Sequence, residues 1–298
     1  MTEFSIRPLT ERFGAEITGL DTTQPLAPRT RDRIVAAYHA HQALVVRGPV
    51  LTPHQFVAFA RSFGDPDPSD TSRYHAPIDV DGFMGLRLVS NIEEDGRNKG
   101  QFGNDEMGWH QDRWTDAAPP PATMLHGVEI TRDGGRTGIV NLCEAYDALP
   151  GDLRARIAGR TIHFPLRVND FEGSLADADP DDETLFRIVP LVQRHAVTGR
   201  DYLFFGARRI LAYIDTSPRI SGLSLAEGAA LLDEIHAHIS QPAFGYLHGW
   251  QAGDILFWDN RCCAHRREPF AADERRLLYA APLIHSDLLW GGALPQAA

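Results

Sequence analysis

The first third of the chain alternates between short apolar runs and amphipathic stretches. Residues 14–20 (GAEITGL) alternate as a β-strand that ends at a turn. Residues 29–41 have helical spacing and lead into an apolar run at 43–47, which predicts a short buried strand. A second helix is expected over residues 53–63, with proline in its first turn, where a missing N–H is tolerated. The pattern therefore predicts a strand–helix–strand–helix start.

The rest of the chain reads mainly as strands. Strands are expected at residues 85–92, 123–130, 137–142, 243–250, 254–258 and 277–284. Helices are expected at 145–157 and 225–239, the second opened by a capping box at Ser224 and Glu227. Strands gathered at both ends, with helices inserted between them, predict a mainly β fold with α insertions. We expect a double-stranded β-helix, or jelly-roll, core decorated by helices.

Composition narrows the class of protein. A chain of 298 residues with 43% hydrophobic content, no internal repeat and no linker fits a single domain over 1–298. The net charge of −11, without a dense basic run, argues against nucleic acid and anionic membranes as partners. No apolar run approaches the ~18 residues of a membrane span. We expect a small-molecule substrate and a protein able to form a homo-oligomer.

Cysteine usage and the N-terminus suggest a compartment. The three cysteines, Cys143, Cys262 and Cys263, are odd in number and two are adjacent, so they do not make a disulfide framework. The first residues lack a basic stretch followed by an apolar block, so no signal peptide is visible. A reducing cytoplasm is therefore the expected location.

Candidate metal ligands lie in the segment WHQD and near residue 265. His110 and Asp112 are two residues apart, so at a strand end both side chains point to the same side. Two imidazoles and one carboxylate suit Fe(II) and leave coordination positions open for a co-substrate and O₂. An isolated His-x-Asp is usually a solvated strand end. Among the thirteen histidines, His265 is the leading third ligand, because it follows an apolar strand that ends in a polar turn.

Other segments add specificity to this pattern. They lie at residues 14–21, 63–65, 109–112, 134–137 (GGRT), 145–149, 258–261 (WDNR) and 275–276 (RR), with His265 between the last two. Together they show that the chain resembles the taurine dioxygenase and 2,4-dichlorophenoxyacetate dioxygenase family of Fe(II)/2-oxoglutarate-dependent oxygenases over nearly its whole length. By this resemblance, His110, Asp112 and His265 match the iron ligands of the family.

The resemblance also implies a 2-oxoglutarate site. In the family, an arginine eleven residues after the distal histidine holds the 5-carboxylate, and a threonine lies twenty-seven residues after the first histidine. Those offsets give Arg276 and Thr137. A guanidinium suits the task because its planar fork matches a carboxylate. Strand alternation lets only one of two adjacent arginines face inward, so we expect Arg276 to be buried and Arg275 exposed.

The resemblance implies a reaction class with Fe(II) as cofactor, 2-oxoglutarate as co-substrate and O₂. 2-Oxoglutarate would be converted to succinate and CO₂, while an unactivated C–H bond of a small organic substrate is oxidised. Hydroxylation is the default outcome, and desaturation, ring formation or cleavage are variants. Related halogenases lack the iron-bound carboxylate, so the presence of Asp112 favours oxygenation.

The substrate is where the chain departs from the family. Members acting on sulfonates or aryloxyacetates carry an arginine fifteen residues after the distal histidine, and this chain has Ala280 there. We therefore expect neither taurine nor an aryloxyacetate, unless Arg266 or Arg208 substitutes, but a substrate derived from specialised metabolism or an amino acid. His75 and Asn91 are weak candidates for substrate binding.

Two other classes of protein are compatible with the same residues. A metal-dependent hydrolase could employ the three ligands with a metal-bound water, but it gives no reason for Arg276 and Thr137 at their offsets. A non-catalytic ligand-binding barrel predicts the loss of at least one ligand, and all three are present.

Overall fold

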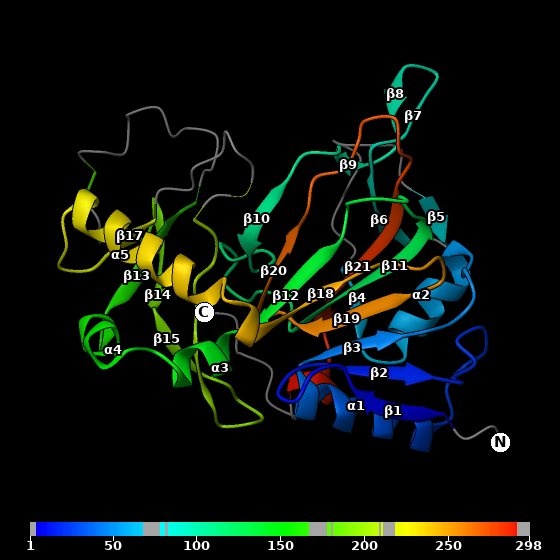
Figure 1. Ribbon diagram of the computed structural model, residues 1–298, viewed down its shortest axis with the longest axis horizontal. Helices are drawn as coiled ribbons and strands as arrows, with labels where there is room; N and C mark the ends of the chain where they lie inside the picture. Colours follow the sequence, from blue (N-terminus) through cyan, green and yellow to red (C-terminus); the bar gives the residue numbers. More distant parts are fainter. Residues whose placement is uncertain are drawn as a thin grey trace.

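A computed structural model describes residues 4–67, 78–80, 83–166, 178–179, 181–208, 210 and 218–290. Its largest feature is a sheet of ten strands within this described part of the chain (Figure 1). The strand order is β1 (Ser5–Pro8), β2 (Ala15–Thr18), β3 (Ala43–Val46), β19 (Ile255–Asp259), β11 (Ala122–Glu129), β21 (Leu277–His285), β6 (Phe83–Ser90) and β5 (Ile78–Val80). Two short strands join it, β4 (Asp65–Pro66) on β21 and β9 (Gln101–Phe102) on β6.

A second sheet packs against the inner face of the first. Its four strands, in order, are β10 (Met107–His110), β20 (Cys263–Arg267), β12 (Thr137–Asn141) and β18 (Gly245–His248). All neighbours in this sheet are antiparallel. Ile139 and Val140 of β12 share one buried cluster with Leu125 of β11 and Trp258 of β19, so the two sheets meet face to face.

Strand alternation divides the core into two apolar layers. In β19, Leu256 and Trp258 belong to the cluster between the sheets, whereas Ile255 and Phe257 belong to the cluster on the outer face. Helices α1 (Pro28–His41) and α2 (Pro53–Arg61) cover that outer face. Because both faces of the strand are buried, its sequence is apolar throughout rather than alternating.

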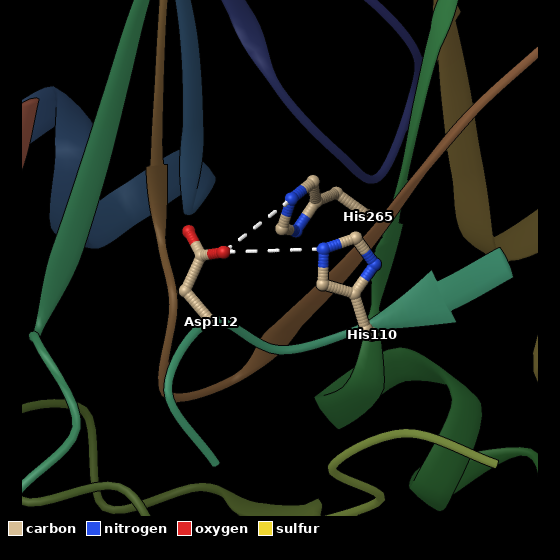
Figure 2. A group of neighbouring side chains, drawn as sticks. All are labelled: His110, Asp112 and His265. Carbon is tan, nitrogen blue, oxygen red and sulfur yellow. Dashed lines mark ion pairs between the residues drawn. The ribbon is translucent and has the colours of Figure 1, made fainter. Parts of the chain in front are cut away.

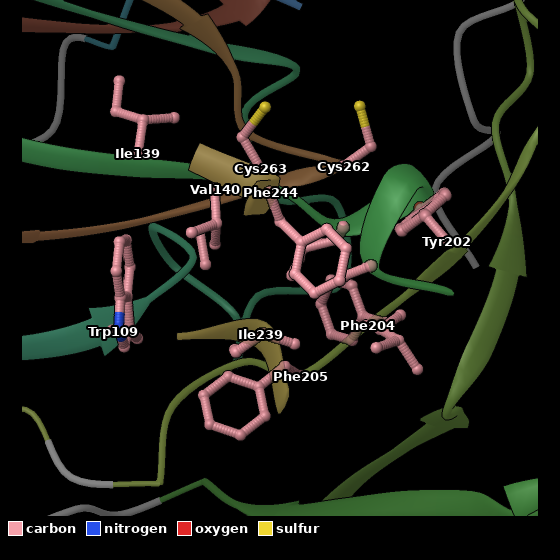
Figure 3. Packing of buried hydrophobic residues seen from close by; sticks show 14 of the residues in the cluster. Trp109, Ile139, Val140, Tyr202, Phe204, Phe205, Ile239, Phe244, Cys262 and Cys263 are labelled. Carbon is pink, nitrogen blue, oxygen red and sulfur yellow. The ribbon is translucent and has the colours of Figure 1, made fainter. Parts of the chain in front are cut away.

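The remaining elements gather beside the two sheets (left in Figure 1). They are α3 (Leu142–Asp147), α4 (Gly151–Ile157), β13 (Thr161–Pro165), β14 (Phe186–Pro190), β15 (Val192–Arg194), β16 (Asp201–Leu203), β17 (Arg219–Ile220), α5 (Leu225–Ile239) and the 3₁₀ turn Pro242–Phe244. Aromatic residues join this lobe to the sheets, since Phe204, Phe205 and Phe244 share one buried cluster with Cys262 and Cys263 (Figure 3). The hairpin β7 (Glu93–Glu94) and β8 (Arg97–Asn98), and helix α6 (Asp287–Trp290), complete the fold.

The structure confirms a mainly β fold with helical insertions. Helix α5 has the predicted bounds, and its capping box between Ser224 and Glu227 is formed. The single helix expected at 145–157 is wrong: Pro150 cannot donate a backbone hydrogen bond, and the segment forms α3 and α4 instead. Residues 93–108, for which no element was predicted, contain short strands, and the strands of the lateral lobe escaped prediction because they are short and lack clean alternation.

Candidate active site

Adjacent strands of the smaller sheet bring the three predicted metal ligands together. His110 ends β10 and lies opposite His265 of β20 in the antiparallel pairing. Asp112 follows two residues later, and its Oδ1 lies 3.9 Å from His110 Nε2 and 3.7 Å from His265 Nε2 (Figure 2). One ligand atom from each residue lies within 4.8 Å of the others, which is close enough for all three to share one metal ion. His265 therefore lies within β20, the strand that follows β19 after a short turn.

Neighbouring groups fix the orientation of the ligands. His110 Nδ1 donates to Gly108 O at 2.8 Å, which leaves Nε2 as the lone-pair nitrogen directed at Asp112. Thr123 Oγ1 donates to Asp112 Oδ2 at 2.6 Å, leaving Oδ1 toward the histidines. Asn260 Oδ1 accepts from Asp112 N at 2.7 Å, and Asn260 Nδ2 donates to Asp112 O at 3.0 Å. The carboxylate is thus positioned before any ion binds.

The residue between the ligands points elsewhere, as alternation predicts. Gln111 is fully buried, and its Oε1 accepts from the backbone N–H groups of Phe205 and Gly206, each at 2.9 Å. Its Nε2 donates to Arg261 O at 2.7 Å. Gln111 therefore ties the metal-ligand turn to the lateral lobe and to the turn after β19.

Electrostatics favour the protonation states that a metal requires. Burial, followed by repulsion from His110, lowers the pKa of His265 to about 3, so this imidazole is neutral near pH 7. Burial alone would raise the pKa of Asp112. The nearby His265 and His110, the Thr123 hydroxyl and the positive charge of Arg87 outweigh that effect and lower it. Neutral imidazole and ionised carboxylate are the forms that bind a divalent cation.

The triad opens into a cavity lined by arginines. The lining combines the three ligands with Thr137, Arg276 and other polar and apolar side chains, and the cavity has a volume of about 110 Å³. Arg276 is 2% exposed, whereas Arg275 is exposed and pairs with Glu129, as the strand alternation predicts. Thr137 Oγ1 accepts from Trp250 Nε1 at 3.0 Å, which orients its hydroxyl.

A second arginine lies beside Arg276. Arg267 is 4% exposed, lines the same cavity and contributes, after burial, to lowering the pKa of Arg276 to about 9. Nη1 of each guanidinium has no hydrogen-bond partner among the described residues. Two adjacent buried cations with open donors make this part of the cavity suited to an anionic group. The sequence analysis did not select Arg267, because no motif or local pattern places it beside Arg276.

The glycine pair in the GGRT segment has a structural reason. Gly135 has a φ of +63°, which residues with a side chain rarely adopt. A Cβ at this position would also lie 3.3 Å from Arg276 Cδ and Nε. Glycine therefore lets the loop pass close against the buried arginine.

The two weak substrate-binding candidates have different outcomes. His75 lies outside the described residues. Asn91 Oδ1 accepts from Arg276 N at 3.0 Å, and its Nδ2 donates to Glu274 O at 2.7 Å. Within the described part of the chain, Asn91 faces a separate polar pocket rather than the cavity of the triad. Its contacts hold the strand that carries Arg276.

A second group of potential ligands is already engaged. His195, Asp259 and Cys262 are buried close together. Arg261 binds Asp259 through Nε and Nη2 at 2.8 and 2.5 Å, and His195 Nε2 contacts the same carboxylate at 3.0 Å. The paired guanidinium takes the place that a cation would need. The three cysteines are buried and free, as expected.

Two packed sheets with a buried His-Asp-His group opening into an arginine-lined cavity define the class of non-haem, metal-dependent oxygenases. The family model "Taurine catabolism dioxygenase TauD, TfdA family" matches residues 5–281. The chain belongs to this family and is an Fe(II)/2-oxoglutarate-dependent dioxygenase.

Characterised relatives span several substrates. The chain is 30% identical over 285 residues to an α-ketoglutarate-dependent 2,4-dichlorophenoxyacetate dioxygenase of Cupriavidus pinatubonensis, covering 93% of this chain and 96% of the relative. It is 27% identical over 290 residues to the pentalenolactone F synthase of Streptomyces arenae, covering 92% and 93% of the two chains. An α-ketoglutarate-dependent sulfate ester dioxygenase of Pseudomonas putida is 29% identical over 274 residues, with coverages of 88% and 83%.

Solved structures agree with the family assignment. A taurine dioxygenase from Burkholderia xenovorans superimposes with a TM-score of 0.73 at 29% identity, covering 95% of this chain and 91% of that chain. The structure of AAD-2 in complex with Mn(II) and N-oxalylglycine gives a TM-score of 0.72 at 27% identity, with coverages of 95% and 98%. Among the described residues, none of the helices has both the length and the apolar character needed to cross a membrane.

Proposed function

We propose that His110, Asp112 and His265 bind Fe(II), and that Thr137 and Arg276 hold the 5-carboxylate of 2-oxoglutarate. On this basis the chain oxidises an unactivated C–H bond of a small organic substrate while 2-oxoglutarate is converted to succinate and CO₂. Hydroxylation is the default outcome, with desaturation or a related oxidation as a variant set by the substrate's position.

The observation that carries this proposal is the state of Arg276. A guanidinium that is 2% exposed, with Nη1 unpartnered among the described residues, has lost water without gaining a full set of protein partners. Burial of a charge in this state is costly unless a ligand completes its hydrogen bonds. Arg276 and the metal triad line one cavity, so a single ligand can contact both. A dicarboxylate with one end at the metal meets both requirements.

The chain's own residues do three things for the reaction. Asp112 and the histidines present a preorganised ligand set, which Thr123 and Asn260 hold in place. Arg276 fixes the distal end of the co-substrate. Bound Fe(II) would supply the redox chemistry with O₂, and apolar side chains of the cavity, among them Leu125 and Leu278, limit the access of water.

The proposed substrate is neither taurine nor an aryloxyacetate. Ala280 lines the cavity but carries no charge to pair with such an anion. The similarity to pentalenolactone F synthase supports an intermediate of specialised metabolism as the substrate. An amino-acid derivative is the alternative substrate. We expect succinate release with taurine or 2,4-dichlorophenoxyacetate to match the rate without substrate. Robust coupled turnover of either compound would contradict this choice.

We further propose that the two sheets form the double-stranded β-helix of this enzyme class and that residues 1–298 make one domain. Joint packing of both sheets through one apolar cluster supports this. Cytoplasmic location and homo-oligomer formation remain part of the proposal, with a small molecule, rather than nucleic acid or membrane, as partner.

The test of the proposed reaction is decarboxylation of 2-oxoglutarate labelled at C1. Fe(II)-loaded protein in air should release labelled CO₂, and release should increase in the presence of a substrate found by screening. Exclusion of O₂ should abolish it. A metal-dependent hydrolase would instead retain ester or amide hydrolysis with Zn(II) and release no CO₂, which would overturn the proposal.

A further inference from the structure

We propose that Arg87 anchors an anionic group, such as a carboxylate, of the prime substrate in the active-site cavity. The proposal rests on the function proposed above and names a substrate class for the same site. Arg87 lies on β6, the strand next to β21 in the large sheet, and it was not among the residues that the sequence singled out.

The register of the sheet places Arg87 directly beside Ala280. The two residues are Cα partners in the antiparallel pairing of β6 and β21, so their side chains leave the sheet on the same face. Both line the cavity that contains His110, Asp112 and His265. Since Ala280 ends at a methyl group, the side chain of Arg87 can extend over it toward the metal ligands.

The other arginines of the described lining make different contacts, and the open Nη1 of Arg267 lies beside Arg276, which is assigned to 2-oxoglutarate. Arg267 Nη2 donates to Phe102 O at 2.8 Å and to Asp105 O, which holds the loop before β10. Arg266 stacks on Trp109, with 5.4 Å from Cζ to the ring centroid, and its Nη2 lies 3.7 Å from a carboxylate oxygen of Glu268. Arg276 is assigned to 2-oxoglutarate. Arg208 pairs with Asp233 and is not part of this lining.

Asp67 holds Arg87 in position. Its Oδ2 accepts from Arg87 Nη2 at 2.7 Å, and the same oxygen also contacts Arg113 Nη1. The side chain of Asp67 is 4% exposed, whereas the side chain of Arg87 is 25% exposed. A guanidinium is a rigid planar fork, so the Asp67 carboxylate at one edge fixes the plane of the Arg87 guanidinium. Arg87 is therefore a preoriented cation at the substrate side of the metal.

A shift of the cation by one strand changes the geometry of recognition. Arg87 enters the cavity from β6 rather than from β21, so an anion that it holds is approached from the neighbouring strand. A substrate anchored at Arg87 would present a different carbon to the metal. This agrees with the proposal that taurine and aryloxyacetates are not turned over, although an anionic substrate is.

Calorimetric titration tests the anchor without requiring turnover. The protein, loaded with Mn(II) and 2-oxoglutarate, is titrated with straight-chain ω-phenyl carboxylates from phenylacetate to 6-phenylhexanoate, and with the matching neutral carboxamides. We expect at least one carboxylate to bind about tenfold or more tightly than its carboxamide. Arg87→Gln should abolish this preference, and Arg87→Lys should retain part of it.

Two controls separate this proposal from the function on which it rests. Arg113 also pairs with Asp67 but is not among the residues that line the cavity. Arg113→Gln therefore removes a neighbouring positive charge and should leave the preference for carboxylates intact. Arg87→Gln should still bind Mn(II) and 2-oxoglutarate. A carboxylate preference that persists in Arg87→Gln, or its absence across the whole series in the native protein, would overturn the anchor. Failure of the native protein to bind 2-oxoglutarate would overturn the proposed function instead.

Discussion

Arg276 and Arg275 are adjacent, yet the fold gives them different environments. Arg276 is buried against the cavity, and Arg275 pairs with Glu129 at the surface. We expect Arg276→Ala to weaken 2-oxoglutarate binding by about 2–5 kcal/mol, since the co-substrate would keep an unpaired buried charge. Arg275→Ala, which removes an exposed pair, should change it by less than about 1 kcal/mol. Dissociation constants from titration of the Mn(II) protein provide the measurement, and equal losses at both positions would contradict the assigned strand phase.

Thr123 gives a second prediction at the scale of one residue. Its hydroxyl donates to the Asp112 oxygen that faces away from the histidines, and Thr123→Val keeps the shape but removes this donor. We expect Mn(II) affinity to fall by about 10–100-fold, as for other residues that orient metal ligands. Thr184→Val, at an exposed threonine, serves as the control. Unchanged metal affinity in Thr123→Val would show that Asp112 needs no such support.

The sequence predicted the metal ligands better than the residues that surround them and hold them in place. His110, Asp112 and His265 could be selected because residue type and offset restrict them strongly, and the structure brings these three together. Thr123, Arg87 and Arg267 could not be selected, because each reaches the cavity only through strand pairings that bring distant segments together. Asn260 lies in the recognised WDNR segment, but its role as a clamp on Asp112 depends on three-dimensional contacts.

At the scale of elements, His126 of β11 connects three parts of the fold. Its Nε2 accepts from Leu51 N at 2.9 Å, just before α2, and its Nδ1 donates to Asp254 O at 3.1 Å, just before β19. Burial lowers the pKa of His126 to about 4. The folded protein therefore keeps this imidazole neutral where the unfolded chain would bind a proton. The associated stability is complete above pH 6.5 and is lost as the pH falls toward 4.

We expect the free energy of unfolding to decrease on acidification from pH 6.5 to 4, with His126 contributing up to about 1.4 kcal/mol per pH unit. Denaturant titrations at several pH values measure this slope. His126→Gln should reduce both the stability at pH 7 and the slope, whereas His54→Gln, at an exposed position of α2, should retain the slope. The same slope in His126→Gln and in the native protein would contradict the prediction.

Element predictions succeeded where the local signals agreed. Helix α5 has a capping box and an unbroken apolar stripe, and its bounds were predicted correctly. Residues 145–157 also have helical spacing, but Pro150 interrupts the backbone hydrogen bonds, and the following glycine begins a new helix. The short strands β13, β14 and β17 pair across long stretches of chain, and β15 and β16 form a hairpin of three residues a strand, too short for local periodicity to reveal.

At the scale of the whole molecule, we expect a fold that does not depend on the metal. Apolar clusters on both faces of the large sheet form the core, and the triad lies at one edge of the smaller sheet. We expect apo native protein and His265→Ala to unfold at similar temperatures. Mn(II) with 2-oxoglutarate at about 100 times the dissociation constant should add about 2.7 kcal/mol to the native protein alone. Thermal unfolding measures both effects, and a failure of the apo native protein to fold would show that the metal supports the fold.

The most direct test of the central claim is the anaerobic visible spectrum of the protein with Fe(II) and 2-oxoglutarate. Chelation of ferrous iron by the 2-oxo acid should produce a weak charge-transfer band in the native protein. We expect His265→Ala to lose this band, and Arg276→Ala to require much more 2-oxoglutarate to form it. Absence of the band in the native protein at saturating Fe(II) and 2-oxoglutarate, or an unchanged band in His265→Ala, would contradict the assignment of this site.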